Sequence, residues 1–120
     1  MEQKKSFLLF FLLVFTTSVL RAQEKVETRF FVAGVCDMCK ERIEKATDVK
    51  GVIYSEWDAS KQELFLVYRP DEISVDSVHA RIQKVGHDTQ KGKADDKDYK
   101  SVHSCCRYRD PEVTDKHRKP

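Results

Sequence analysis

The sequence lacks an apolar run long enough for a membrane-spanning helix, and it lacks a strong excess of either charge. Its longest apolar stretch, Phe7–Leu20, has 14 residues, whereas a spanning helix needs about 20. The formal net charge of the 120 residues is only +2, which gives no indication of nucleic acid or an acidic polymer as a partner. The sequence is therefore not typical of an integral membrane protein or of a nucleic-acid-binding protein.

Motifs of catalysis are missing as well. The sequence shows no Ser-His-Asp set, no glycine-rich phosphate loop and no pair of carboxylates arranged for acid–base chemistry. A length of 120 residues corresponds to one domain and leaves no room for a large enzyme fold with a deep cleft. We therefore expect a protein that is not an enzyme.

The first 22 residues are typical of a secretory signal peptide. Lys4 and Lys5 precede the apolar stretch Phe7–Leu20, and the small residue Ala22 precedes the polar Gln23. We expect cleavage after Ala22, export to the periplasm or the exterior, and no stable membrane anchor after cleavage. An uncleaved N-terminal anchor is the alternative, whereas no cysteine follows the apolar stretch to suggest a lipoprotein.

The charge balance changes near Lys91. Residues 23–90 contain 10 basic and 13 acidic side chains, whereas residues 91–120 contain 9 and 6. The last segment has little aliphatic content, so it cannot build a core by itself. We divide the chain into a signal peptide (1–22), a domain (23–93) and a polar C-terminal tail with a cysteine pair (94–120).

The central part of the chain alternates between strand and helix patterns. Runs rich in aromatic and β-branched residues predict strands at residues 28–35, 52–57 and 63–68. Helices are expected at residues 36–48 and 75–85, the second with Ser74 as N-cap and Gly86 as stop. A short fourth strand is expected at residues 87–93. The order β-α-β-β-α-β predicts an α+β, ferredoxin-like sandwich.

Alternation along the strands predicts a buried face and an open face of the sheet. Inward positions are expected at Phe30, Val32, Val52, Leu64 and Leu66. The other face, expected at Phe31, Tyr54, Phe65 and Val67, would form a contact surface or be covered by the tail. His79 is expected at the surface of the second helix.

The chemistry is concentrated in the motif Cys36-Asp37-Met38-Cys39, where the first strand leads into the first helix. This spacing lets both sulfurs face one ion, and a helix N-terminus favours the thiolate form. Two thiolates suit a soft cation such as Cu(I), and Zn(II) and Hg(II) accept the same ligands.

Two other readings of the motif stay open. A thiol–disulfide redox protein would also use Cys36 and Cys39, but thioredoxin-like folds are longer and usually carry an aromatic residue before the motif and a proline opposite it. A structural interaction module would explain the apolar sheet face but not four cysteines.

The flanks of the motif resemble a known family. The stretch Phe30–Cys39, continued by Ile43, Glu44, Ala46 and Gly51-Val52, resembles the heavy-metal-associated domain of copper chaperones, metal-transporting ATPase modules and periplasmic mercury-binding proteins. Tyr68-Arg69-Pro70 and Lys84-Val85-Gly86-His87 extend the resemblance to roughly residues 27–92. It implies a ferredoxin-like module that binds one soft metal ion through Cys36 and Cys39, with Cu(I) as the first candidate. It also implies thiolate exchange with a metal-donor or metal-acceptor protein, such as a metal-transporting ATPase or an efflux component.

Further candidate ligands lie outside the motif. In the family fold, the loop that contains His87 lies beside the loop that carries Cys36 and Cys39, which we call the metal loop. His87 is therefore a third ligand, a group that tunes the thiolates, or an ordinary helix-end histidine. Met38 is expected to face solvent.

The tail carries His103, Cys105 and Cys106. Side chains of adjacent cysteines diverge, so the pair is not expected to chelate one ion by itself. Two interpretations are equally open: one of the two joins His103 or the Cys36–Cys39 pair around a metal, or they form a disulfide within the tail, to the Cys36–Cys39 loop or to another chain. A mobile tail with incidental thiols is the third. A flexible dozen residues reaches about 17–21 Å, enough to bring the tail thiols to the metal loop.

Overall fold

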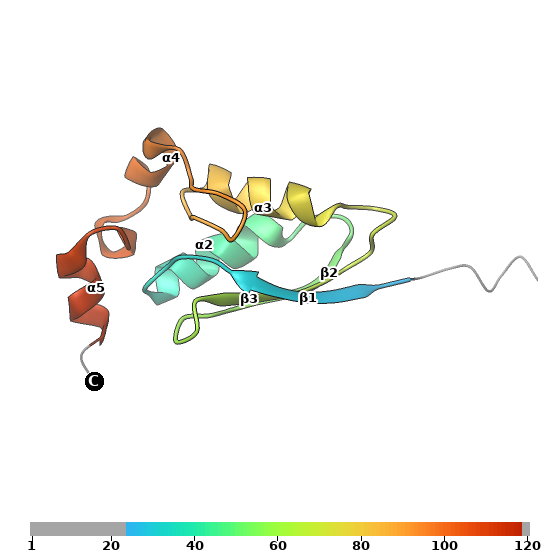
Figure 1. Cartoon of the computed structure of the whole chain (residues 1–120), viewed down its shortest axis with the longest axis horizontal. Coiled ribbons are helices and arrows are strands. Elements are labelled where there is room, and N and C mark those ends of the chain that lie inside the picture. The colour runs from blue at the N-terminus through green and yellow to red at the C-terminus, as the bar shows by residue number, and fades with distance from the viewer. Residues whose placement is uncertain (1–23, 119–120) are drawn as a thin grey trace, which may run out of the picture.

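Residues 24–118 are described by a computed structural model, in which two helices cover one face of a small antiparallel sheet (Figure 1). The elements of this part are β1 (Val26–Phe31), α2 (Asp37–Thr47), β2 (Val52–Asp58), β3 (Glu63–Tyr68) and α3 (Val75–Lys84). The strand order is β1-β3-β2, with both pairings antiparallel. This α+β arrangement is the one that the sequence pattern predicts.

The expected signal peptide lies outside the described residues. Within residues 24–118, no helix combines the length and the apolar character that crossing a membrane requires.

The fourth strand predicted after α3 is wrong as a regular strand. The segment makes one bridge to the end of β1, between Val32 and Thr89, supported by a hydrogen bond of 2.9 Å from Ala33 N–H to Asp88 O. Thr89 then pairs with Gly92, so the chain turns back on itself after a single residue of pairing. The contact nevertheless joins the segment after α3 to the loop that follows β1.

The ending of α3 sets the direction of the segment that follows it. Gly86 has φ +99°, a conformation that favours glycine. The N–H groups of Gly86 and His87 donate to Gln83 O at 2.9 Å and to Ile82 O at 3.2 Å. This pair of bonds is the glycine-based helix ending known as the Schellman motif, and it turns His87 back toward the core.

The core lies between the sheet and the two helices. Most of the predicted inward positions are buried, and Trp57 joins them at 1% exposure: Phe30, Val32, Leu64, Leu66. Val52 is only partly buried but packs against the core, and the register of β2 shifts between Val52 and Tyr54. That shift lets Val52 and Trp57 both face the core although they are an odd number of residues apart.

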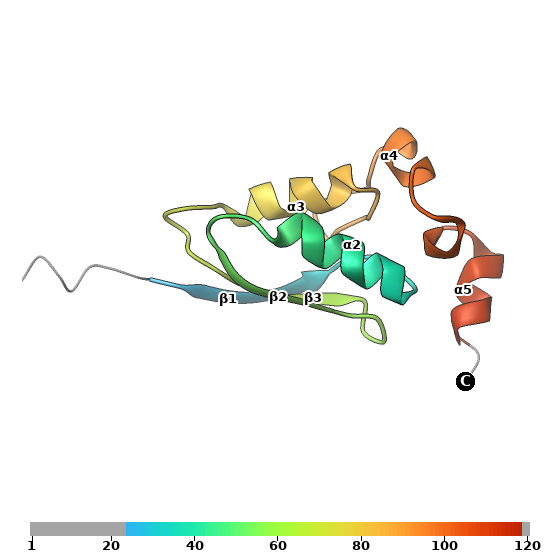
Figure 2. The same cartoon turned by 180° about the vertical axis from the view of Figure 1, so that it is seen from behind.

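The opposite face of the sheet carries exposed apolar side chains, as predicted for Phe31 and Tyr54, which are 45% and 49% exposed. Within residues 24–118, neither the two helices nor the tail lie over this face (Figure 2). Val67 is an exception, since it is only 8% exposed. It lies in the central strand, directly between its register partners Glu27 and Tyr54, whose side chains flank it.

The expectation of a surface position for His79 is wrong. His79 is 4% exposed, its ring lies 4.0 Å from the ring of Phe30, and its Nδ1 is 2.8 Å from Thr89 Oγ1. The physical reason is the turn after α3, which folds Thr89 back over the helix face that carries His79.

The C-terminal tail is folded against one end of the domain. It contains α4 (Asp96–Lys100), the short 3-10 helix η1 (Ser104–Cys106) and α5 (Pro111–Arg118). In both overall views the tail lies beside the end of the sandwich where α2 begins (Figure 1 and Figure 2). Val102 and Cys106 are buried and belong to the core.

Candidate metal centre

Cys36 and Cys39 lie at the start of α2. Cys36 is the N-cap residue of the helix, with extended backbone, and Cys39 is in the first turn. Their sulfurs are 3.3 Å apart, with Cys36 half-buried and Cys39 fully buried. Because residues three apart at a helix start share one side, the local backbone is enough to pair these two thiols.

The loop before α2 passes close to the ring of Trp57. A Cβ atom added at Gly34 would lie 2.7 Å from Cζ2 of Trp57 and 3.2 Å from the Cβ of Cys39. Trp57 is itself held in place, since its Nε1–H donates a hydrogen bond of 3.0 Å to Val32 O. Glycine at position 34 therefore lets the loop approach the core closely, next to the thiols.

The tail brings a third buried thiol to this pair. Cys106 Sγ lies 3.0 Å from Cys36 Sγ, and the sulfurs of Cys36, Cys39 and Cys106 all lie within 4.8 Å of one another. We call these three residues the sulfur triad. Burial, followed by the neighbouring Cys36 and Cys39 thiols, raises the pKa of the Cys106 thiol. The triad is thus a closely packed group of soft donors, two of which are buried.

The second tail cysteine lies outside the triad. Cys105 is half-buried, with its Sγ 3.9 Å from Cys36 Sγ and 3.4 Å from Met38 Sδ. Met38 is 41% exposed, in agreement with the solvent-facing position expected for it. All four cysteines of the chain are free thiols in the structure.

The two candidate histidines do not join the triad. His103 is exposed at the start of η1. His87 is fully buried, and its Nδ1–H donates a hydrogen bond of 2.8 Å to Ala33 O, in the loop that leads to Cys36. Its Nε2 is buried and has no hydrogen-bond partner among the described residues. Burial lowers the pKa of His87, so the ring is held neutral as a support for the loop.

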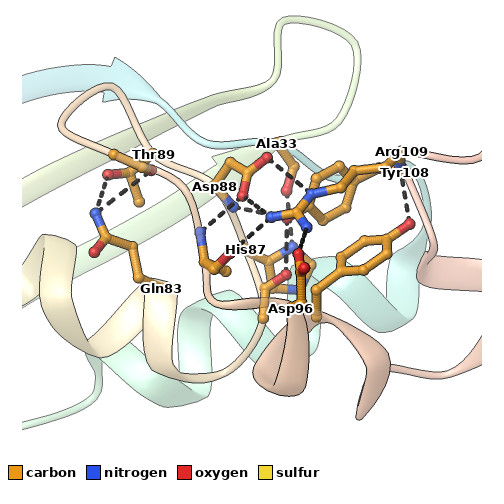
Figure 3. A network of polar contacts seen from close by, with 12 residues as sticks. Ala33, Gln83, His87, Asp88, Thr89, Asp96, Tyr108 and Arg109 are labelled. Atoms are coloured by element: carbon orange, nitrogen blue, oxygen red, sulfur yellow. Dashed lines mark hydrogen bonds and ion pairs between the residues drawn. The ribbon is translucent and has the colours of Figure 1, made fainter.

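Sequence reasoning missed the residues that hold the tail in place (Figure 3). The Tyr108 hydroxyl donates to Gly86 O at 2.8 Å and accepts from Asp88 N–H at 2.8 Å, and its ring stacks on His87. Arg109 Nη2 donates to Asp88 Oδ1 at 2.7 Å and to Ala94 O at 2.8 Å. Tyr108 and Arg109 follow the cysteine pair in the sequence, but their partner Asp88 lies 20 and 21 residues before them and gives no local signal.

Asp88 is the centre of this network. Burial disfavours its charged form, but hydrogen bonds from Arg109 and from Ala94 N–H outweigh burial, so the pKa of Asp88 lies below its ordinary value. Asp88 therefore stays ionised beside the Arg109 guanidinium. We call the contacts of Tyr108 and Arg109 with residues 86–88 and Ala94 the tail latch.

Comparisons with known proteins point to one kind of fold. No family model matches the sequence, and no curated protein matches it. Among solved structures, the N-terminal domain of a potential copper-translocating P-type ATPase from Bacillus subtilis, in the Cu(I)-loaded state, is 26% identical, with a TM-score of 0.54 over 57% of this chain and 90% of that chain.

Two further structures are similar at lower identity. A putative copper-ion-binding protein from Bacillus anthracis is 18% identical, with a TM-score of 0.55 over 57% of this chain and 100% of that one. Oxidized MerP from Ralstonia metallidurans is 17% identical, with a TM-score of 0.53 over 56% of this chain and 96% of that one.

The chain therefore has the ferredoxin-like fold of these domains, and its resemblance to the heavy-metal-associated domains is confirmed. Each match spans nearly the whole of the other protein but little more than half of this one. More than two fifths of the chain thus has no counterpart in these neighbours.

Proposed function

We propose that this is an exported protein that binds one soft metal ion through Cys36 and Cys39, with Cu(I) as the first candidate. The observation that carries the proposal is the pair of thiols 3.3 Å apart at the start of α2, in a fold shared with the Cu(I)-loaded domain from Bacillus subtilis. Thiolates are the ligands that Cu(I) prefers, and Hg(II) and Zn(II) are the competing ions.

The role that fits this site is to carry or sequester the ion rather than to catalyse a reaction. Transfer would proceed by thiolate exchange. A thiolate of the partner forms a bond to the ion while a bond from Cys36 or Cys39 breaks, and the oxidation state of the ion does not change. A metal-transporting ATPase or an efflux component is the proposed partner. Support comes from the Bacillus subtilis neighbour, which is a domain of a potential copper-translocating P-type ATPase.

Export rests on the sequence of the first 22 residues and is tested separately. If the signal peptide is cleaved after Ala22, N-terminal sequencing of the exported protein will begin at Gln23. A retained Met1 in the membrane fraction would mean that the segment is an anchor instead.

The binding proposal is tested with the double variant Cys36→Ser, Cys39→Ser. Anaerobic titration with Cu(I) against a chelator of known affinity should show one ion per chain for the wild type and an affinity lower by orders of magnitude for the variant. Met38→Leu is the matched control, because it changes the other sulfur of the motif, which is 41% exposed. Unchanged affinity in the double variant would show that the ion binds elsewhere.

A further inference from the structure

The tail is built to hold one particular thiol against the metal loop. Val102, four residues before Cys106, is buried and lies so close to Gly86 that a Cβ added there would be 2.6 Å from Cγ1 of Val102. On the other side of Cys106, Tyr108 and Arg109 make the tail latch. Cys106 is therefore fixed from both sides.

The metal loop is fastened to the same short segment. His87 donates to Ala33 O, and Ala33 N–H donates to Asp88 O, at 2.8 and 2.9 Å. Figure 3 shows Ala33, Tyr108 and Arg109 converging on His87 and Asp88. Because residues 86–88 anchor both the loop and the tail, the separation between the thiols of the loop and the thiol of Cys106 is set by a common support.

We propose that Cys106 is a third metal ligand, so that the ion is enclosed by the three thiolates of the sulfur triad, each thiol giving up its proton to solvent as its bond to the ion forms. This inference rests on the proposed function and adds the ligand that the tail supplies. With metal–sulfur bonds of about 2.3 Å, three sulfurs around one ion in a plane lie about 4.0 Å apart. The present separations of 3.0 and 3.3 Å from Cys36 need only a widening of about 1 Å or less to reach that value.

The geometry selects Cys106 and not its neighbour. Cys106 Sγ is fully buried and 3.0 Å from Cys36 Sγ, whereas Cys105 is half-buried, 3.9 Å from Cys36 Sγ, and turned toward Met38. In η1 the two side chains diverge, so one of them points into the triad and the other away from it. Cys105 is therefore the matched comparison for Cys106.

A third ligand changes how the ion leaves. In a site of two cysteines on a loop, an incoming thiolate reaches the ion directly. Here an incoming thiolate must also displace Cys106, which the tail latch and the Val102–Gly86 contact hold in place. The tail therefore slows release of the ion. A partner must displace the tail before it can take the ion.

Three measurements on the full chain with Cu(I) under anaerobic, reducing conditions test this inference. X-ray absorption should find three sulfur neighbours per copper in the wild type and in Cys105→Ser, but two in Cys106→Ser. Transfer of copper to an excess of chelator should be at least tenfold faster in Cys106→Ser and within twofold of wild type in Cys105→Ser. Arg109→Ala, which leaves all sulfurs in place, should also accelerate transfer.

The outcomes distinguish failure of the third ligand from failure of the proposed function. Two sulfur neighbours in the wild type, or equal transfer rates in the Cys105 and Cys106 variants, would overturn the third ligand and leave the proposed function standing. Failure of the wild type to bind one Cu(I) would overturn the proposed function itself. If Cys106→Ser does not fold, the wild-type sulfur count and the Arg109→Ala rate decide the question.

Discussion

Removal of the Arg109 side chain should weaken the docking of the tail without unfolding the domain. Arg109→Ala deletes the hydrogen bonds to Asp88 and to Ala94 O, at 2.7 and 2.8 Å. The side chains of Arg109 and Asp88 are 27% and 15% exposed, so this ion pair is neither fully buried nor at the open surface. The change leaves a partly buried carboxylate without its cation.

The size of the effect follows from these contacts. A hydrogen bond to a charged group contributes about 1.5–3 kcal/mol. Asp88 keeps its bond of 2.8 Å from Ala94 N–H, so the lower part of that range applies. We expect a loss of about 2 kcal/mol in the docking free energy of the tail, which corresponds to about a 30-fold rise in the population of the undocked state.

Amide hydrogen exchange measures this population directly. The Asp88 amide donates to the Tyr108 hydroxyl, so it is protected only while the tail is docked. Its exchange should be about 30-fold faster in Arg109→Ala, whereas amides of the central strand β3 should be unchanged. Arg107→Ala is the matched control, because Arg107 is exposed and makes no ion pair within residues 24–118. Equal Asp88 exchange in both variants would refute the latch.

Other expectations follow from single contacts. Gly86→Ala should lower the free energy of unfolding by about 2 kcal/mol in urea, because φ is +99° and the new Cβ would meet Val102 at 2.6 Å; a change below about 0.5 kcal/mol would contradict this. Stability should fall as the pH drops below about 6.5, since burial lowers the pKa of His87 and His79, so that the unfolded chain takes up protons first. His87→Gln should reduce that slope, and an unchanged slope would leave His79 as its source. Fluorescence of the sole tryptophan, Trp57, should change on loading with Cu(I) because its ring lies against the cysteine loop; a constant signal at full loading would place the ion elsewhere.

The parts of the fold that the sequence predicted are those with a local physical cause. Alternation places Phe30 and Leu64 inside, helical spacing places the two helices, and Gly86 ends α3, each through the geometry of a few consecutive residues. The same holds for Cys36 and Cys39, because three residues at a helix start bring two side chains together without help from the rest of the chain.

The two wrong predictions, the surface position of His79 and the fourth strand, have a common origin. His79 was expected at the surface because its helix face carries polar residues, but Thr89 returns over that face and satisfies the ring with a hydrogen bond. The prediction of a fourth strand is wrong because Thr89 also pairs with Gly92, so the chain turns back, which the strand pattern does not reveal. In both cases the outcome depends on where the chain goes after α3, which local preference does not set.

Residue order along the chain is enough to place two thiols at the start of a helix in a small α+β domain, and a cysteine pair in a tail long enough to reach them. Which of the two tail thiols lies beside the helix depends on contacts between distant segments. Cys106 and Cys36 are 70 residues apart, and their sulfurs lie 3.0 Å from each other. They meet because Tyr108 and Arg109 find partners on residues 86–88, the segment that also supports the metal loop. Such an arrangement depends on hydrogen bonds between distant segments, which no spacing of residues along the chain encodes.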